Sequence, residues 1–595
     1  MMERERTRTR SFVRGLLFGV IFSLLFGLAY PPTDLWWLVV LAPVPLLLAA
    51  RGCSRPLWCA VGVSAATMPM WALHHSWIGG ISALGLPPLA LYLSLWPGIF
   101  VWMMARLART RDWVYWLGAP VVWTGLEMLR GEVVWHGYPW FLLAHPMIEW
   151  EWFSRGASVF GVYALSLIVC SASALLACAI ACRNCETHRW RNIGIAGACI
   201  TACSVVLSVI GGSTAASSER APVRIGVVQT SLPQTIRGAW SLEDRIDTMR
   251  RLITLSFEAV MHEPSPDLIV WPETLFPGPT LSEDALAELR AHYEGLYPGH
   301  DVEPLLFDTT MRQISAQLSI PMIIGARGYD GFRIESAGGD RFVDVWDGTY
   351  NSAFVVTDGV IEAQRYDKMH LTPFGEVMPY ISNWKWLESR LLSFGAAGMA
   401  FDLDAGETPV VLSVETRDGR TIRLATPICF EATISRVCRR LVFEGAERRA
   451  DVLLNLTNDG WFGGHPGGRA HHLLVSRWRC VELGTPMVRS ANTGISAVID
   501  ARGRVLIRGP QSVLDDDWSM RPGGRGDEQR AGVIVGAVEP GAGVTAYGRV
   551  GNLVGWICLG LSVCLLVPVI RAGSGSRSSR EPMAEKTNDA PGGAA

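Results

Sequence analysis

This sequence has little net charge, no long basic run and few cysteines outside its most apolar segments. The formal net charge is −2 over 595 residues, and nothing in the charge pattern suggests a nucleic-acid partner. Of the 13 cysteines, only Cys429, Cys438 and Cys480 lie where the composition is that of a soluble domain. Three thiols are too few for a disulfide framework. A thiol that stays reduced in a soluble domain is instead available for nucleophilic chemistry.

Apolar residues are abundant and unevenly placed. They make up 49% of the chain and concentrate in roughly the first 215 residues and in one stretch near the end. Because a spanning helix needs about 20 mostly apolar residues, this distribution predicts a polytopic α-helical membrane domain of about eight spans. The expected segments are 11–30, 35–50, 57–78, 86–107, 113–129, 157–182, 193–212 and 550–570.

These segments divide the chain. We expect a membrane domain over 1–215, a soluble domain over 221–545, a C-terminal transmembrane helix over 549–571 and a disordered cytoplasmic tail over 572–595. The tail is rich in polar and small residues, which bury too little apolar surface to fold.

Arginines indicate the direction of the spans, since positively charged loops stay in the cytoplasm. They gather at the N-terminus and after every second span, at 4–14, 51–55, 106–111, 183–191 and 571–580. The loop after the fifth span is the weak point of the pattern, because it carries Arg130 and Arg155. The pattern predicts cytoplasmic termini and a soluble domain on the opposite face, which is the periplasm in a two-membrane bacterium.

The soluble part alternates short apolar runs with amphipathic stretches. The run 241–262 predicts a helix that is capped by Ser241 and has Ile246 and Phe257 on its apolar face. Further helices are expected over 431–446 and 468–484, a hairpin over 494–507, and strands over 221–230, 267–273, 321–329, 351–358, 423–430 and 451–459. Strands rich in β-branched residues between helices indicate an α/β domain with a buried sheet.

Three chemically active side chains lie at or near the ends of expected strands. Glu273 closes the run 267–273, Lys368 follows a strand and turn, and Cys429 lies between a strand and the next helix. Strand-to-helix junctions of α/β sheets place side chains where ligands bind. The helix dipole after Cys429 would favour the thiolate.

Five motifs occur in order along the soluble part. They are WPE (271–273), DKMHLTPFGE (367–376), ICFE (428–431), NDGWFG (458–463) and RSANTGISAVID (489–500). Their spacing resembles that of the nitrilase superfamily, which implies an α-β-β-α sandwich. Together with the surrounding membrane spans, the motifs resemble those of the apolipoprotein N-acyltransferase family, and the resemblance covers nearly the whole chain.

The resemblance implies a two-step acyl transfer. Cys429 would attack an ester carbonyl of a membrane phospholipid and form a thioester, with Glu273 as general acid and base and Lys368 as oxyanion stabiliser. The α-amine of S-diacylglyceryl cysteine, at the N-terminus of an apolipoprotein, would then take the acyl chain. The resemblance also implies a multi-pass protein of the bacterial inner membrane with its catalytic domain on the periplasmic side. We expect a monomer that needs no cofactor.

The same resemblance suggests residues around this centre. The supporting residues are Glu376, Asn351, Glu431, Phe430 (through its backbone N–H) and Trp240. The segment 278–317 looks longer than in the family, and we interpret it as an enlarged loop or helical insertion that affects the substrate entrance.

Other interpretations remain open. His465, His471 and His472 could suggest a metal, but their spacing fits no common zinc pattern, and we expect none. A membrane-anchored amidase would share Glu273, Lys368 and Cys429 and hydrolyse a small amide, but it would need only one anchor. A transporter or sensor would need no catalytic constellation and would carry more charged residues inside its spans.

Overall fold

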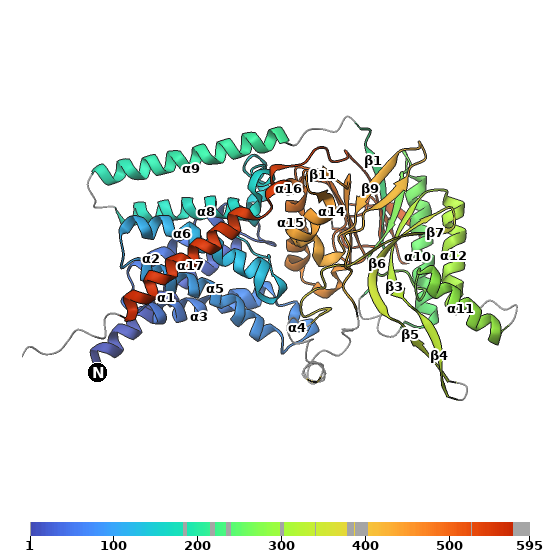
Figure 1. Cartoon of the computed structure of the whole chain (residues 1–595), viewed down its shortest axis with the longest axis horizontal. Coiled ribbons are helices and arrows are strands. Elements are labelled where there is room, and N and C mark those ends of the chain that lie inside the picture. Colours follow the sequence, from blue (N-terminus) through green and yellow to red (C-terminus); the bar gives the residue numbers. More distant parts are fainter. Residues whose placement is uncertain are drawn as a thin grey trace, which may run out of the picture.

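The computed structural model has two parts, a bundle of long helices and a domain built on β-sheets, which lie next to each other along the longest axis of the molecule (Figure 1). The structure describes residues 2–182, 187–214, 220–233, 240–297, 303–338, 341–377, 386, 403–524 and 526–574. The expected C-terminal tail lies almost entirely outside the described residues.

Five helices among the described residues are long and apolar enough to cross a membrane. They are α1 (Met2–Leu28), α3 (Pro56–His74), α5 (Leu86–Leu107), α8 (Ala157–Ala181) and Trp190–Gly212 within α9 (Thr187–Thr214). Two shorter apolar helical stretches, Trp36–Arg51 and Leu553–Leu566, coincide with two further expected spans. The count of about eight spans stays a prediction.

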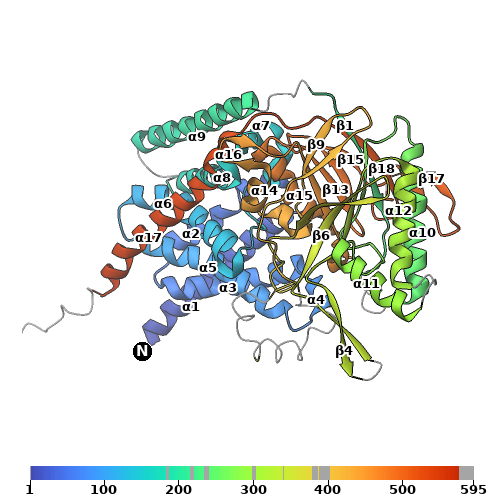
Figure 2. The ribbon, with the colours of Figure 1, turned by 45° about the vertical axis from the view of Figure 1, so that its right-hand side comes forward.

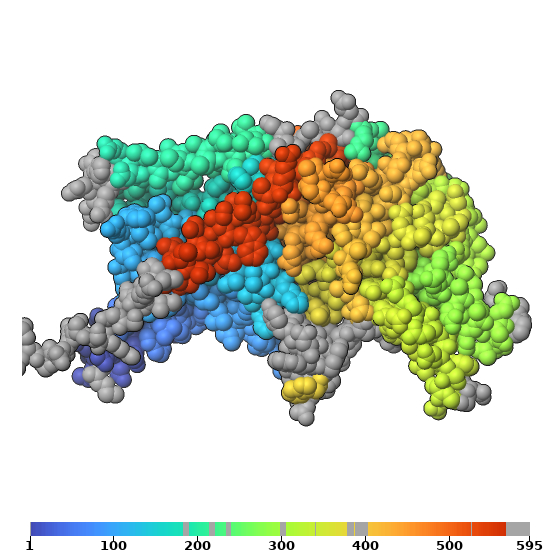
Figure 3. All heavy atoms as spheres, viewed as in Figure 1, coloured from blue at the N-terminus to red at the C-terminus, as the bar shows by residue number. Residues whose placement is uncertain are grey.

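Small residues allow the first helices to pack closely. A Cβ at Gly15 of α1 would lie 2.1 Å from the carbonyl oxygen of Cys59, and one at Gly62 of α3 would lie 2.3 Å from that of Phe12. Farther along the chain, α6 (Asp112–Met128) packs against α8 and α17 (Leu553–Ser574). The final helix α17 runs obliquely across the bundle surface, from the β domain toward the far end of the bundle (Figure 3).

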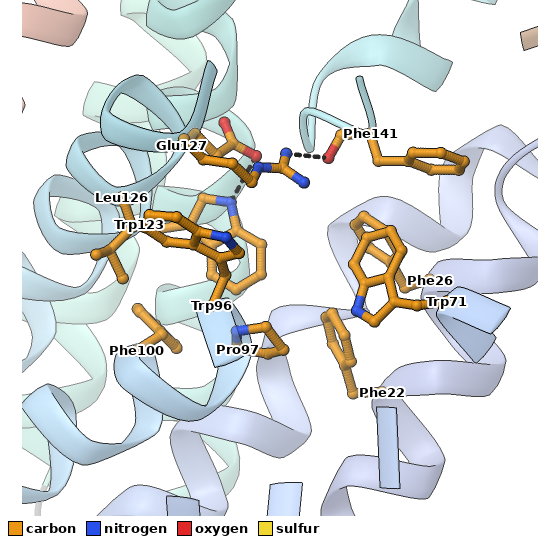
Figure 4. Close-up of a pocket in the computed structure, with 11 residues that line it drawn as sticks. Phe22, Phe26, Trp71, Trp96, Pro97, Phe100, Trp123, Leu126, Glu127 and Phe141 are labelled. Carbon is orange, nitrogen blue, oxygen red and sulfur yellow. Dashed lines mark hydrogen bonds between the residues drawn. The ribbon is translucent and has the colours of Figure 1, made fainter. Parts of the chain in front are cut away.

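Two buried residues, Arg130 and Glu127, hold a segment between α6 and α8 that contacts the β domain. Arg130 donates to the carbonyl oxygens of Trp140 (2.8 Å) and Phe141 (3.0 Å). Glu127 accepts from the amide of Leu143 at 2.6 Å. Both charged side chains line a cavity of about 40 Å³ whose other walls are mostly aromatic (Figure 4). Arg130 is therefore a buried structural residue, which explains its poor fit to the arginine pattern.

Two sheets form the core of the soluble domain. One has eight strands in the order β17-β16-β18-β1-β2-β3-β6-β7, and the other has six in the order β15-β14-β13-β12-β9-β8. The first comprises β1 (Val223–Gln229), β2 (Leu268–Trp271), β3 (Met322–Asp330), β6 (Gly348–Thr357), β7 (Val360–Asp367), β16 (Ser512–Leu514), β17 (Met520–Pro522) and β18 (Gly532–Val538). The second comprises β8 (Leu412–Glu415), β9 (Thr421–Ala425), β12 (Val452–Thr457), β13 (Met487–Ala491), β14 (Ala497–Ile499) and β15 (Val505–Arg508).

Parallel strands lie at the centre of each sheet. In the first sheet β1 pairs with β2 and β2 with β3 in parallel, and in the second β12 pairs in parallel with both β9 and β13. Parallel neighbours need crossover connections, which here contain helices. They are α10 (Leu242–Met261), α11 (Glu283–Leu296) and α12 (Glu303–Leu318) in the first sheet, and α14 (Ser435–Val442) and α15 (Pro466–Leu483) in the second.

Side chains alternate between two layers of core. Ile225 and Val227 of β1 belong to the buried cluster that contains Val488 of the second sheet, whereas Val228 packs with Leu252 of α10. Helices α10 and α12 thus cover the outer face of the first sheet, while α14 and α15 lie between the second sheet and the helical bundle (Figure 2). Because α15 contacts α8, the second sheet and its helices face the membrane part.

The sequence correctly predicts the N-terminal cap of α10 but not all of the residues on its buried face. Ser241 accepts from the amide of Asp244, and the Asp244 carboxylate accepts from the Ser241 amide, so the expected cap is present. Ile246 and Phe257 are nevertheless 48% and 39% exposed. The helix packs the apolar side chains around Leu252 against the sheet, whereas Ile246 and Phe257, at the edge of the expected apolar face, remain exposed to solvent.

The segment 278–317 forms α11 and most of α12. Phe307 and Met311 of α12 are buried in the same cluster as Leu252 of α10. This helix is part of the layer that covers the first sheet, and an effect of the segment on the substrate entrance stays a prediction.

Candidate active site

Glu273, Lys368 and Cys429 come together beyond the ends of three strands. Glu273 follows β2, Lys368 directly follows β7, and Cys429 follows β9. They are 6%, 0% and 8% exposed, respectively. Lys368 pairs with Glu273, and the thiol of Cys429 feels the charges of both.

Lys368 is a buried ammonium between two carboxylates. Its Nζ lies 2.6 Å from Glu376 Oε2 and 3.8 Å from Glu273 Oε1, and Thr372 Oγ1 is 3.4 Å away. Burial by itself lowers the pKa of an ammonium, but the carboxylates of Glu376 and Glu273 outweigh it and raise the pKa of Lys368. Lys368 is therefore positively charged at neutral pH, and Glu376 is its closest partner.

Asn351 links the two carboxylates. From β6, its Nδ2 donates to Glu273 Oε1 at 2.8 Å and to Glu376 Oε1 at 3.4 Å. The backbone carbonyl oxygen of Asn351 accepts a hydrogen bond from the backbone amide of Lys368 at 2.9 Å. Asn351 thus positions both acids around the ammonium.

Cys429 occupies a strained backbone turn. Its φ is +52°, in the left-handed region that costs a non-glycine residue about 1–2 kcal/mol. Cys429 begins the short 3₁₀ turn η6 (Cys429–Thr433), and the regular helix α14 starts only at Ser435. The helix expected over 431–446 is therefore shorter and starts later.

The expected stabilisation of the thiolate by a helix dipole is wrong. Burial, and next the carboxylate of Glu273, raise the pKa of Cys429 to about 12, although Lys368 and a hydrogen bond with Thr457 lower it. The resting cysteine is a thiol at neutral pH, and its chemistry needs a base.

Glu431 braces the loops that carry the lysine and the cysteine. One oxygen accepts from the amides of Met369 and His370, each at 2.8 Å, and the other accepts from the amide of Ile428 and the Tyr366 hydroxyl, also at 2.8 Å. Burial raises the pKa of Glu431 to about 7. These contacts connect the residue before Cys429 with the two residues after Lys368, so Glu431 holds the two loops together.

Phe430 connects the turn that carries Cys429 to the membrane part. Its ring is stacked with Trp140 at 6.4 Å between centroids and with His370 at 6.1 Å. Trp140 lies on the segment that Arg130 holds, and is 3% exposed. The role of the Phe430 backbone N–H as an oxyanion donor stays a prediction.

Trp240 stands one residue before the cap of α10. It is partly buried, and its indole N–H has no hydrogen-bond partner among the described residues. The structure thus gives it no polar contact with the cluster around Lys368, and its role stays a prediction.

Sequence reasoning missed a polar junction beside the site. Arg436 of α14 pairs with Glu132 at 2.7 Å and donates to His370 Nδ1 at 3.3 Å. Glu132 also accepts from Ser435 and from Asn552, which stands directly before α17, each at 3.2 Å. The junction joins Glu132, which follows α6, to the first residues of α14 and to the residue before α17. The charges of Glu132 and Arg436, three hundred residues apart, offered no signal in the sequence.

The three histidines weighed as metal ligands have protein partners. His472 Nδ1 lies 2.8 Å from Asp459 Oδ1, His471 is stacked on Phe141 at 4.0 Å, and His465 accepts from the amide of Gly468 at 3.1 Å.

Comparison with known families agrees with this architecture. Residues 224–515 match the family model for carbon-nitrogen hydrolases, so the soluble domain is of that class. Residues 22–175 match the model for the N-terminal domain of apolipoprotein N-acyltransferase.

Curated relatives extend the match over both parts. The apolipoprotein N-acyltransferase of Ralstonia nicotianae is 27% identical over 568 residues, which cover 92% of each chain. That of Geobacter metallireducens is 26% identical over 489 residues, which cover 81% of this chain and 79% of the relative. Among solved structures, an amidase from Nesterenkonia sp. matches with 15% identity and a TM-score of 0.31, over 54% of this chain and 92% of the amidase. The chain belongs to the apolipoprotein N-acyltransferase family of the nitrilase superfamily, and it is a membrane-bound acyltransferase.

Proposed function

We propose that this protein transfers an acyl chain from a membrane phospholipid, through a thioester on Cys429, to the N-terminal α-amine of an S-diacylglyceryl-cysteine apolipoprotein. The observation that carries the proposal is the buried cluster of Glu273, Lys368 and Cys429 at the junction with the helical bundle. A site at this junction suits two substrates whose acyl chains lie in a membrane.

In the first step Cys429 attacks the ester carbonyl of the phospholipid. Because the pKa of the thiol is raised to about 12, Glu273 takes the thiol proton as attack begins. The C–S bond forms, the ester C–O bond breaks, and Glu273 returns the proton to the leaving lysophospholipid alcohol. Lys368, kept charged by its carboxylate partners, stabilises the tetrahedral oxyanion.

In the second step the free α-amine of the lipoprotein attacks the thioester. An α-amino group has a pKa near 8, so a useful fraction is neutral at neutral pH. The C–N bond forms and the C–S bond breaks. Glu273 accepts a proton from the amine and returns it to the sulfur of Cys429.

Oxyanion stabilisation by Lys368 and by the N–H of Phe430 is worth about 3 kcal/mol per donor. Asn351 and Glu376 hold the ammonium in place, and Glu431 keeps the lysine loop against the cysteine turn. This division of work requires no metal or cofactor.

The proposal includes a location and a division of the chain. The arginine pattern supports a bacterial inner-membrane protein with the domain 221–545 on the periplasmic face, between the membrane domain 1–215 and the helix 549–571. We also propose that the protein is a monomer.

The test uses the purified full chain in detergent with a phospholipid that carries a labelled acyl chain, without acceptor. Intact-protein mass spectrometry should find one hydroxylamine-labile acyl chain on the wild type and none on Cys429→Ser. Cys480→Ser is a matched control, because Cys480 is a buried thiol inside α15 of the same domain. A diacylated lipopeptide should then discharge the adduct onto its amine. Absence of the adduct together with hydrolysis of small amides would favour an amidase instead.

A further inference from the structure

A polar residue stands in the middle of an otherwise apolar strand. The strand β12 reads VLLNLT and is buried along its whole length, and Asn455 within it is 0% exposed. A buried amide is tolerated in a sheet when its hydrogen-bonding groups are satisfied. Its partners therefore indicate what the residue does.

The side chain of Asn455 reaches the turn that carries the proposed nucleophile. Its Nδ2 donates to the carbonyl oxygen of Pro427 at 2.8 Å and to that of Cys429 at 3.4 Å. Between them, Ile428 forms a parallel bridge with Leu456 of β12. Thr457, two residues after Asn455 and so on the same face of the strand, lowers the pKa of the Cys429 thiol. The backbone of the turn is thus held from β12.

The carbonyl of Cys429 matters because of the group on the other side of the same peptide. In a planar trans peptide the C=O and the following N–H point in opposite directions. A donor that holds the Cys429 carbonyl against β12 therefore aims the Phe430 N–H away from β12. Since Cys429 is held at a φ of +52°, this orientation persists only while its surroundings enforce it.

A second layer fixes the orientation of the Asn455 amide. Asn455 and Arg489 are paired neighbours on the parallel strands β12 and β13. Arg489 Nη1 donates to Asn455 Oδ1 at 2.5 Å, and its Nη2 lies 2.9 and 2.8 Å from the two oxygens of Asp459. Because the Oδ1 of Asn455 faces a guanidinium, its Nδ2 faces the turn.

We infer that Asn455 is a positioning residue for acyl transfer, which aims the Phe430 N–H at the oxyanion by holding the carbonyl of Cys429. The inference rests on the proposed function, because it presupposes a tetrahedral intermediate on Cys429. It predicts that Asn455 matters for attack on a carbonyl, which creates an oxyanion, and not for alkylation of the same thiol, which creates none.

The experiment compares the two reactions in Asn455→Asp and Asn455→Leu. The aspartate keeps the shape and the acceptor for Arg489 but loses the donor, and the leucine removes the donor without adding charge. In both variants, acylation of Cys429 by labelled phospholipid should slow by about 10- to 100-fold at saturating phospholipid, with KM unchanged. Alkylation by iodoacetamide should stay within about twofold of wild type, because it needs no oxyanion hole.

Gln229→Glu is the matched control. Gln229 is also fully buried, and its Nε2 donates to two carbonyl oxygens, those of Glu528 (2.9 Å) and Arg530 (2.8 Å), neither of which belongs to the turn that carries Cys429. This variant should acylate at the wild-type rate.

Wild-type acylation in the two Asn455 variants overturns the inference, and so does an equal fall in acylation and alkylation. If the leucine variant does not fold, the aspartate variant decides alone. A labile acyl adduct on Cys429→Ser would instead refute the proposed function, so the two failures are distinguishable.

Discussion

Removing the negative charge of Glu376 tests whether Lys368 works as an oxyanion stabiliser that is held away from the base. In Glu376→Gln the ammonium loses its partner at 2.6 Å and keeps Glu273 at 3.8 Å. At an effective dielectric constant of about 20, a charge pair at that distance interacts by about 4 kcal/mol, so Lys368 is drawn toward Glu273. The shift weakens the base and withdraws a donor worth about 3 kcal/mol from the oxyanion.

We therefore expect Glu376→Gln to slow acylation of Cys429 by about 100-fold, and the lost buried charge to cost about 3 kcal/mol of stability. Single-turnover mass spectrometry of the labelled acyl-enzyme measures the rate, and thermal unfolding in the same detergent follows the stability. Glu376→Asp keeps the charge and should lose less. A folded Glu376→Gln protein that acylates within about threefold of wild type would refute the reasoning, because Lys368 would then work without its closest partner.

Three further predictions follow from the same region. Burial and Glu273 raise the pKa of Cys429 to about 12, so the rate at which iodoacetamide alkylates the resting enzyme should keep rising up to about pH 10. Glu273→Gln should move this profile of alkylation rate against pH to lower pH. A plateau of the wild-type rate below about pH 8 would contradict the prediction. Glu132→Gln and Arg436→Gln should each lower the midpoint of thermal unfolding, and their effects should be non-additive by about 0.5–3 kcal/mol in a double-mutant cycle; strict additivity would show that the pair is not coupled. Burial lowers the pKa of His370 from 6.5 to about 3, so between about pH 3 and pH 6.5 the unfolded chain binds more protons than the folded protein. Stability should therefore be full above about pH 6.5 and fall as the pH drops through this range, less steeply in His370→Gln than in wild type. Identical slopes of unfolding free energy against pH in the two proteins would argue against this prediction.

Local patterns were reliable where the determinants are local. Ser241 caps α10 as its sequence predicts, because a capping box depends on residues three apart. The expected strand 451–459 contains β12, and the expected helix 468–484 matches α15, since buried strands and amphipathic helices have their own periodicities.

Local patterns failed where long-range packing decides. The sequence placed Ile246 on the apolar face of α10, yet the helix buries the side around Leu252 and leaves Ile246 exposed. It assigned a helix dipole to Cys429, yet the turn that carries the cysteine is short, and burial beside Glu273 controls the thiol pKa.

The sequence by itself determined the two-part organisation and the chemical identity of the centre. Apolar runs of spanning length mark the helical part, and an acid, an amine and a thiol near strand ends mark the site. Only the tertiary structure decided how these groups are held: Asn351 between two carboxylates, Glu431 across two loops, Asn455 under the cysteine turn, and Arg436 against Glu132. Each of these contacts joins residues from different strands, helices or domains, and their distances depend on how sheets and helices pack, which no local pattern along the chain encodes.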